Sequence, residues 1–268
     1  MTEINIPREL RATFDDAPEV YDRVRPVASP EVFDDLVALA GLEPGARLVE
    51  IGCGTGQATL PLAERGFDIV ALELGERLAE HARRKLARFP RVRVMASSFE
   101  DWDPRGERFD AVVSFNAFHW IDPEVRFEKS AGILRPGGAL ALVAMHYVTP
   151  DDADPVWVAL QEDYEAVLGP SARSAAPPHP DAVEDRAREI ESSGCFRAVI
   201  VRRYLENITF GADDYVGLLG TSSWHRQLDD SARRELLERI AHRIRRYPAQ
   251  TLTPTLLTML YVAERVSR

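Results

Sequence analysis

The sequence predicts an α/β protein in which a mostly parallel sheet carries helices on both faces. Residues 47–65 read as a short apolar strand, a turn with three glycines, and a helix. A second apolar run over 68–74 is followed by a helical pattern over 76–89, and two further apolar runs occupy 91–96 and 109–116. Strands that alternate with helices in this way are typical of parallel sheets, because each crossover needs a helix.

Composition sets limits on the class of protein. The chain has 268 residues, 45% hydrophobic and 28% charged, which suits one α/β domain with an insertion. Its net charge of -10 argues against a general nucleic-acid or membrane-surface binder, but does not exclude one local basic pocket. Cys53 and Cys195 predict no disulfide framework. No His, Cys or Asp residues have the spacing of metal ligands, so no metal site is expected. The sequence shows no signal peptide and no apolar run long enough to span a bilayer, so a cytoplasmic protein is expected.

The glycine turn, E-I-G-C-G-T-G over 50–56, is the strongest single signal for function. Glycines let the chain turn sharply, and they let a ligand approach the backbone without meeting a Cβ. The N–H groups at the start of the following helix favour negative charge on that ligand, so the turn predicts a nucleotide-type cofactor site. The dinucleotide pattern G-x-G-x-x-G does not fit, because its third position falls on Gln57 or Thr59. This mismatch counts against an NAD-dependent oxidoreductase.

The string E-x-G-x-G-x-G resembles motif I of the class I S-adenosylmethionine-dependent methyltransferases. The Y-D-x-x-R-P segment over 21–26 resembles the N-terminal segment of many small-molecule methyltransferases. F-N-A-F-H-W-I-D over 115–122 is similar to the segment after the fourth strand in type-11 and trans-aconitate-like methyltransferases, and L-R-P-G-G over 134–138 to the family's crossover into the fifth. The resemblance spans about Tyr21 to Met145. It implies a Rossmann-like seven-stranded sheet with an antiparallel last strand, S-adenosylmethionine as cofactor, and a small-molecule methyl acceptor.

The resemblance also implies roles for individual residues. Glu50 is expected to orient the methionine amino end of the cofactor, and Glu73, 21 residues beyond Gly52, to accept hydrogen bonds from the ribose hydroxyls. Ser98 stands where many members carry an Asp for the adenine amino group. The predicted cofactor-binding residues are Tyr21, Arg25, Glu50, Gly52, Cys53, Gly54, Gly56, Gln57, Glu73, Leu74, Ser98, Phe99 and Asn116. The alternatives are a solvated helix face for Tyr21 and Arg25, and an ordinary exposed acid for Glu73.

His119 is the candidate catalytic residue. It comes just after the strand over 109–116, and in doubly wound sheets ligands lie outside the carboxyl ends of the strands. A histidine can take a proton near neutral pH, so His119 is a candidate general base. The alternative is that it hydrogen-bonds a carbonyl or packs under the cofactor, since methyl transfer to an ionised acceptor can rely on proximity alone.

One methyltransferase domain is expected over 1–268. Within it, 1–146 would be the cofactor-binding core with an N-terminal cap, 147–250 the helical cover and strand elements of the acceptor side, and 251–268 the last strand. Patterns after 147 predict helices over 155–168, 182–192 and 231–246, strands over 198–210 and 255–266, and a loop over 169–181. No motif there identifies the acceptor, and a cofactor-binding module without methyl transfer stays an alternative.

Overall fold

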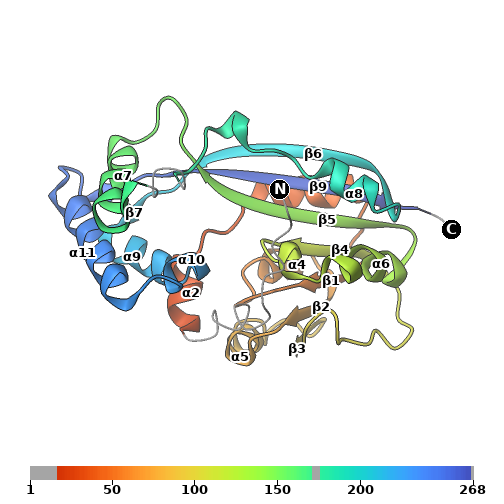
Figure 1. Ribbon diagram of the computed structural model, residues 1–268. Helices are drawn as coiled ribbons and strands as arrows, with labels where there is room; N and C mark the ends of the chain where they lie inside the picture. Colours follow the sequence, from red (N-terminus) through yellow and green to blue (C-terminus); the bar gives the residue numbers. More distant parts are fainter. Residues whose placement is uncertain (1–16, 171–175, 267–268) are drawn as a thin grey trace.

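The computed structural model describes residues 17–170 and 176–266. They form one seven-stranded sheet with helices packed around it (Figure 1). The strand order is β3-β2-β1-β4-β5-β9-β6. Strands β1 to β5 are parallel, and β9 is antiparallel to both of its neighbours, which confirms the predicted fold class. The strands are β1 (Arg47–Ile51), β2 (Asp68–Glu73), β3 (Val92–Ala96), β4 (Phe109–Phe115), β5 (Leu134–Val148), β6 (Phe196–Asn207) and β9 (Thr255–Arg265).

Helices cover both faces of the sheet because the central strands are apolar on both. In β5, Leu140 and Leu142 pack in one hydrophobic cluster, whereas Ala141 and Val143 pack in the other. The first cluster includes α6 (Pro123–Ile133) and α8 (Ala187–Ser192), and the second includes α3 (Pro30–Leu39), α4 (Thr59–Glu64) and α5 (Glu76–Lys85). Successive residues of a strand point to opposite faces, so one apolar run supplies both layers.

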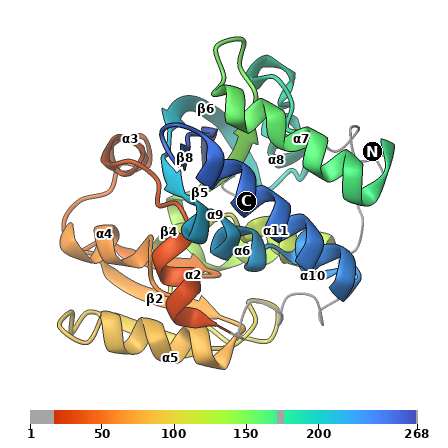
Figure 2. The same ribbon diagram turned by 90° about the vertical axis from the view of Figure 1, so that its left-hand side faces the viewer.

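A third hydrophobic cluster forms a helical cap at one end of the sheet (Figures 1 and 2). Trp157 of α7, Tyr215 of α9 and Leu236 of α11 are buried in it, and Val24 of α2 joins them from the start of the chain. The cap consists of α2 (Pro18–Val24), α7 (Pro155–Leu168), α9 (Ala212–Gly220), α10 (Ser223–Arg226), α11 (Asp230–Arg246) and the ribbon of β7 (Phe210–Gly211) with β8 (Thr251–Leu252).

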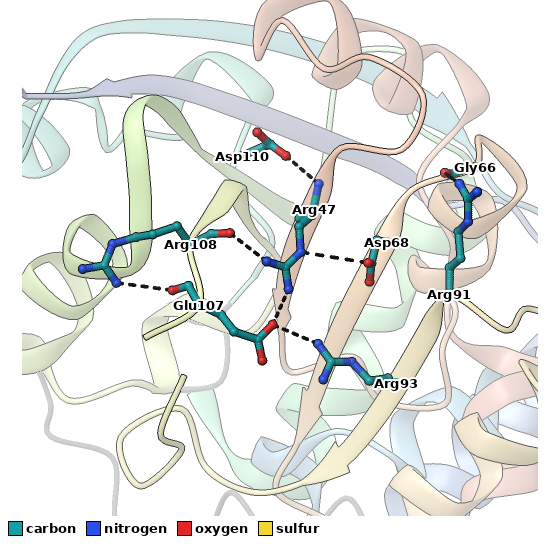
Figure 3. A network of polar contacts seen from close by, with 8 residues as sticks. All are labelled: Arg47, Gly66, Asp68, Arg91, Arg93, Glu107, Arg108 and Asp110. Atoms are coloured by element: carbon teal, nitrogen blue, oxygen red, sulfur yellow. Dashed lines mark hydrogen bonds and ion pairs between the residues drawn. The ribbon is translucent and has the colours of Figure 1, made fainter. Parts of the chain in front are cut away.

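Charged groups tie the strands together at their amino ends (Figure 3). The backbone N–H of Arg47 donates to Asp110 over 2.6 Å, and its guanidinium pairs with Glu107 and, at 3.9 Å, with Asp68. Glu107 also pairs with Arg93 at 3.2 Å. These partly exposed pairs contribute modestly to stability, and they place a stabilising network, not a ligand pocket, at this end of β1, β2 and β4.

Several element boundaries differ from the sequence predictions. The helix predicted over 76–89 ends at Lys85, with Leu86 as its C-cap. Pro90 disfavours a helical conformation only at Phe89, the residue before it. The helix predicted over 182–192 begins only at Ala187, and the guanidinium of Arg203 binds the Pro180 and Val183 carbonyls that precede it.

Elsewhere the helix over 155–168 is confirmed, and the L-R-P-G-G turn is part of β5. Residues 171–175 of the predicted loop lie outside the described residues.

Candidate functional site

A cavity of about 390 Å³ lies at the carboxyl ends of β1, β2, β4 and β5, the edge at which parallel α/β sheets bind ligands. The glycine turn that follows β1 and Glu73 at the end of β2 line it, together with Asn116 after β4 and Tyr147 near the end of β5. The cap closes the cavity, with Arg25 next to α2 and Leu218 of α9 among the lining residues. The cavity therefore lies between the sheet and the cap.

Almost all of the predicted site residues come together here. His119 and the following predicted cofactor-binding residues line the cavity: Tyr21, Arg25, Glu50, Gly52, Cys53, Gly54, Gln57, Glu73, Leu74, Ser98, Phe99 and Asn116. Gly56 does not line it. A Cβ on Gly56 would lie 2.9 Å from Cδ1 of Leu86, so this glycine lets the turn pack against the segment after α5. Its φ of +81° and this close packing both favour a glycine, and the cofactor contact expected of Gly56 stays a prediction.

The other two glycines of the turn have different surroundings. Gly52 has φ +71° and Gly54 has φ +57°, in the left-handed region that favours glycine. A Cβ on Gly52 would lie 2.3 Å from the Cβ of Ala117, which is too close for any side chain. A Cβ on Gly54 would lie 3.5 Å from the ring of Tyr21, which is ordinary contact. Gly52 therefore permits close packing of two loops. At Gly54 the absence of a side chain leaves the backbone accessible beneath the Tyr21 ring.

Glu73 fixes the shape of the turn. Its Oε2 accepts a hydrogen bond of 2.8 Å from the backbone N–H of Gly54, and its Oε1 accepts one of 2.9 Å from Gly75. The side chain lines the cavity while the residue is only 9% exposed. An ionised carboxylate has about four acceptor positions, so Glu73 can hold the turn and still accept ligand hydroxyl groups.

Glu50 is buried without a partner. It is 1% exposed, and neither carboxyl oxygen has a hydrogen-bond partner among the described residues. Burial, together with the nearby Glu73, raises its pKa to about 7, while the Thr59 hydroxyl opposes the rise. A buried carboxyl group without a partner is costly, so this site favours a ligand that brings a cation or a donor.

Helix α2 is fastened to the glycine turn by residues that the sequence did not single out for this role. Asp22 accepts hydrogen bonds of 2.7 Å from both Thr55 and Lys85. The side-chain amide of Gln57 donates to the backbone carbonyls of Asp22 at 3.3 Å and Arg25 at 3.2 Å. In the sequence, only the Asp of the Y-D-x-x-R-P segment pointed to this contact. Asp22 positions α2 over the glycine turn.

Arg25 connects the same segment to the cap. Its Nε donates to Oγ1 of Thr221 over 2.9 Å, and its Nη2 to the Thr221 carbonyl over 2.7 Å. The guanidinium lies 5.1 Å from the centroid of the Tyr21 ring, a cation–π contact. The segment around Tyr21 therefore joins the cofactor turn to the end of α9.

The loop after β3 forms another wall. Oγ of Ser98 donates to Asp101 over 2.8 Å and accepts from the Asp101 backbone N–H over 3.0 Å, so Ser98 mainly shapes this loop. Phe99 is buried, and the ammonium group of Lys129 lies 5.3 Å from its ring centroid. Trp102 packs in the core against Phe109, with ring centroids 5.9 Å apart.

His119 faces the cavity from the short 3-10 helix η2 (Phe118–Trp120), with its ring 5.2 Å from that of Trp120. Burial, together with the nearby Arg186, His146 and Arg126 side chains, lowers its pKa to about 4. By surface area the residue is exposed, and it borders the cavity. It is uncharged at neutral pH and accepts a proton only weakly.

The remaining wall was not predicted from the sequence. The hydroxyl of Tyr147 is buried without a hydrogen-bond partner among the described residues, and burial raises its pKa, so it remains a neutral phenol. Met145, Leu218 and Leu256 give this side an apolar character.

Over residues 17–170 and 176–266, no group of three or more His, Cys, Asp or Glu side chains is arranged to hold a metal ion. Within the same residues, no helix combines the length and the apolar character that crossing a membrane requires.

Part of the chain matches a known family of protein domains. A family model described as a methyltransferase domain matches residues 48–138. An uncharacterized methyltransferase of Mycobacterium tuberculosis is 34% identical over 136 residues, which cover 51% of this chain and 53% of the relative. A demethylmenaquinone methyltransferase of Clavibacter sepedonicus is 29% identical over 143 residues, 51% of this chain and 58% of the relative. The chain thus spans little more than half the length of these curated relatives.

Solved structures share the fold. A chain from Anaeromyxobacter dehalogenans assigned to the type II methyltransferases has a TM-score of 0.63 at 24% identity, with 90% of this chain and 97% of that chain covered. A methyltransferase from Thiobacillus denitrificans in complex with S-adenosylhomocysteine has a TM-score of 0.53 at 16% identity. The match covers 99% of this chain and 100% of that chain. With the match over 48–138, the sheet order and the glycine turn, the chain contains a methyltransferase domain of the class I, S-adenosylmethionine-dependent type.

Proposed function

We propose that this chain transfers a methyl group from S-adenosylmethionine to a small-molecule acceptor. The observation that carries the proposal is Glu50, which lies beside the glycine turn that Glu73 holds. Its carboxyl group is buried and has no hydrogen-bond partner among the described residues. A ligand with a cationic amino group would supply the missing partner, and a nucleoside would place ribose hydroxyls at Glu73. S-adenosylmethionine combines both features, and when bound it supplies an electrophilic methyl group on a sulfonium.

Each part of the cofactor has candidate residues in the cavity. Glu50 would bind the amino group, and Glu73 the ribose. The backbone around Gly54 would accommodate the cofactor without a clash, while Ser98 and Phe99 would border the adenine. Tyr21, Arg25, Gly52, Cys53, Gln57, Leu74 and Asn116 complete the proposed cofactor wall. These residues hold and orient the ligand and contribute no group that reacts.

A small acceptor suits the available space. The cavity of about 390 Å³ is in the size range of small-molecule sites, and it would have to hold the cofactor as well. Demethylmenaquinone methyltransferase, a relative over half of this chain, is named for a small molecule. Residues 147–250 would form the acceptor side, 1–146 the cofactor core with its N-terminal cap, and 251–268 the last strand, in one domain.

His119 would lie beside the transferring methyl group. Proximity and orientation alone can lower such a barrier by roughly 7–11 kcal/mol, so the cavity walls need only align the acceptor. Because the pKa of His119 is near 4, it would be a weak general base that suits acceptors with an acidic proton or none to lose.

Calorimetry with S-adenosylhomocysteine and with NAD tests the cofactor assignment. The proposal expects S-adenosylhomocysteine to bind and NAD not to bind, and the reverse would contradict it. A screen with methyl-labelled S-adenosylmethionine against small metabolites then separates an enzyme from a module that binds cofactor without methyl transfer.

A further inference from the structure

The strand order separates two parts of the cavity. Strand β5 lies next to β4, two strands from β1 and three from β2. Because neighbouring strands are about 4.8 Å apart, Tyr147 on β5 lies roughly 10 Å from the strand of Glu50 and roughly 14 Å from that of Glu73. These two glutamates are the proposed contacts of the cofactor. The wall at Tyr147 therefore faces the part of the cavity that is left for a methyl acceptor.

This wall is apolar except for one hydroxyl group. Met145 precedes Tyr147 by two positions on β5, and Leu256 of β9 is paired directly opposite Tyr147, so the three side chains lie on one face of the sheet. Leu218 of α9 adds an apolar side chain from the cap, and all four residues line the cavity. Among them, only Tyr147 carries a side chain that can donate a hydrogen bond.

The protein leaves the hydroxyl of Tyr147 without a partner. Its Oη is buried and has no hydrogen-bond partner among the described residues. The ring packs against that of Trp157, with centroids 5.7 Å apart. Nε1 of Trp157 donates to the Val148 carbonyl and to Oγ1 of Thr149, each over 3.1 Å, so it offers nothing to Tyr147. A buried hydroxyl group without a partner costs about 1–3 kcal/mol.

Tyr164 of α7 shows how the cap treats a tyrosine that lies away from the cavity. Its hydroxyl lies 2.9 Å from Nε2 of His225, within hydrogen-bond distance, and it does not line the cavity. Of these two tyrosines, the one that borders the cavity is thus the one whose hydroxyl has no partner in the protein. Buried polar groups are nearly always paired, so this difference indicates a partner that arrives with a ligand.

We propose that Tyr147 binds the methyl acceptor by donating a hydrogen bond to an uncharged oxygen of it, such as a carbonyl oxygen, beside an apolar body. This role rests on the proposed methyl transfer and adds to it a class of acceptor and the residue that recognises it. Met145, Leu218 and Leu256 would pack against the apolar body. A site that donates a hydrogen bond to a ligand oxygen discriminates against an analogue that lacks this oxygen, because the buried donor then stays unpaired.

Thermal unfolding of the free protein is the first test. Tyr147→Phe removes a hydroxyl group without a partner, so its Tm should equal or exceed that of the wild type. Tyr164→Phe is the matched control, and its Tm should fall because it leaves His225 without its hydrogen bond. A Tm of Tyr147→Phe below that of the wild type would show that the hydroxyl already has a partner inside the protein, and would overturn the proposal.

The second test measures recognition of an oxygen directly. Protein loaded with S-adenosylhomocysteine is titrated by calorimetry with acetophenone and with α-methylstyrene, which has the same shape but carries a CH₂ group in place of the carbonyl oxygen. The wild type should bind acetophenone about tenfold more tightly than the alkene. Tyr147→Phe should bind the two compounds equally, and Tyr164→Phe should keep the preference.

Three results would overturn the proposal: no binding of acetophenone, equal affinity of the wild type for both compounds, or a preference that persists in Tyr147→Phe. Each of them would leave methyl transfer itself in place, since the cofactor is already bound in these titrations. Failure of the wild type to bind S-adenosylhomocysteine would instead refute the proposed function.

Discussion

Gly54 donates its backbone N–H to Oε2 of Glu73 over 2.8 Å, so the residue that ends β2 holds the turn that follows β1. The second oxygen of the same carboxylate accepts from Gly75, at the start of α5. One side chain thus joins two neighbouring strand–helix turns at the edge of the cavity. The arrangement predicts that Glu73 affects cofactor binding in two ways, through the ribose and through the shape of the turn.

Replacement of Glu73 should therefore weaken cofactor binding strongly. Glu73→Ala removes charge-assisted hydrogen bonds, and we expect a loss of roughly 1.5–3 kcal/mol in S-adenosylhomocysteine affinity by calorimetry. Glu73→Gln keeps one oxygen for a backbone donor, so it should lose less. Glu80→Gln on α5 provides the matched control and should bind like the wild type. Unchanged affinity in Glu73→Ala would exclude the ribose assignment.

Glu50 predicts a pH dependence of cofactor binding. Its pKa is about 7 in the free protein against an ordinary 4.5, so near pH 6 it is mostly protonated and must lose its proton to pair with a cationic amino group. S-adenosylhomocysteine affinity should therefore rise between pH 6 and 8, and calorimetry in buffers of different ionisation enthalpy should show proton release. Glu50→Gln should bind more weakly and lose both effects. A wild-type affinity that does not change with pH would contradict the role of Glu50.

The same group predicts a stability difference with a definite sign. Because burial raises the folded-state pKa of Glu50 above its unfolded value, its contribution to stability is complete below about pH 4.5 and is lost as the pH rises through about 7. The free Glu50→Gln protein should therefore gain Tm relative to the wild type as the pH rises from 5 to 8. A difference in Tm that is constant over this range would argue that the Glu50 pKa is not raised.

The glycines of the turn should separate stability from binding. Gly54→Ala costs about 1–2 kcal/mol for its left-handed backbone and should also weaken S-adenosylhomocysteine binding, because the new Cβ lies at the cavity. Gly66→Ala, with φ +86° and nothing near its Cβ, measures the backbone cost alone and should bind normally. Gly52→Ala adds a clash with Ala117 and should unfold at the lowest temperature of the three. If Gly66→Ala weakened S-adenosylhomocysteine binding as much as Gly54→Ala does, the effect of Gly54→Ala could not be assigned to a Cβ at the cavity.

The sequence was informative where the chemistry is local along the chain. Glu50, the glycine turn and Glu73 follow one another within one strand–turn–helix–strand unit, so their spacing alone predicts that they meet. The seven-stranded topology was predicted from the family resemblance, whose motifs occur in the expected order between Tyr21 and Met145. A pattern of three glycines does not say which residue faces the cavity, and the structure places Gly56 against Leu86, outside the cavity lining.

Contacts between distant segments were beyond sequence reasoning. Arg25 and Thr221 are 196 positions apart, and their hydrogen bond depends on how α9 packs in the cap. Tyr147 lies in an apolar strand whose pattern gives no sign of function, and its hydroxyl is of interest only because the end of β5 lies at the cavity. Tyr147 and Thr221 fall within 147–250, the predicted acceptor side, for which the chain has no local motif.

His119 can be tested as a base once an acceptor is known. A general base should contribute roughly 10²–10⁴-fold, so His119→Gln would lose that factor in kcat with cofactor affinity intact. Because its pKa is about 4, the wild-type rate should keep its acid limb near pH 4, and the variant should lose it. His242→Gln on the exposed side of α11 is the control. Equal losses of cofactor affinity and rate would make His119 a residue that packs against the cofactor.

The most direct test of the account is a crystal structure of the protein with S-adenosylhomocysteine. We expect the ligand to lie in the cavity at the carboxyl ends of β1, β2 and β4, with its amino group at Glu50 and its ribose hydroxyls at Glu73. Its sulfur should face the wall formed by His119 and Tyr147. A ligand bound elsewhere, or in this cavity with its ribose away from Glu73, would contradict the account.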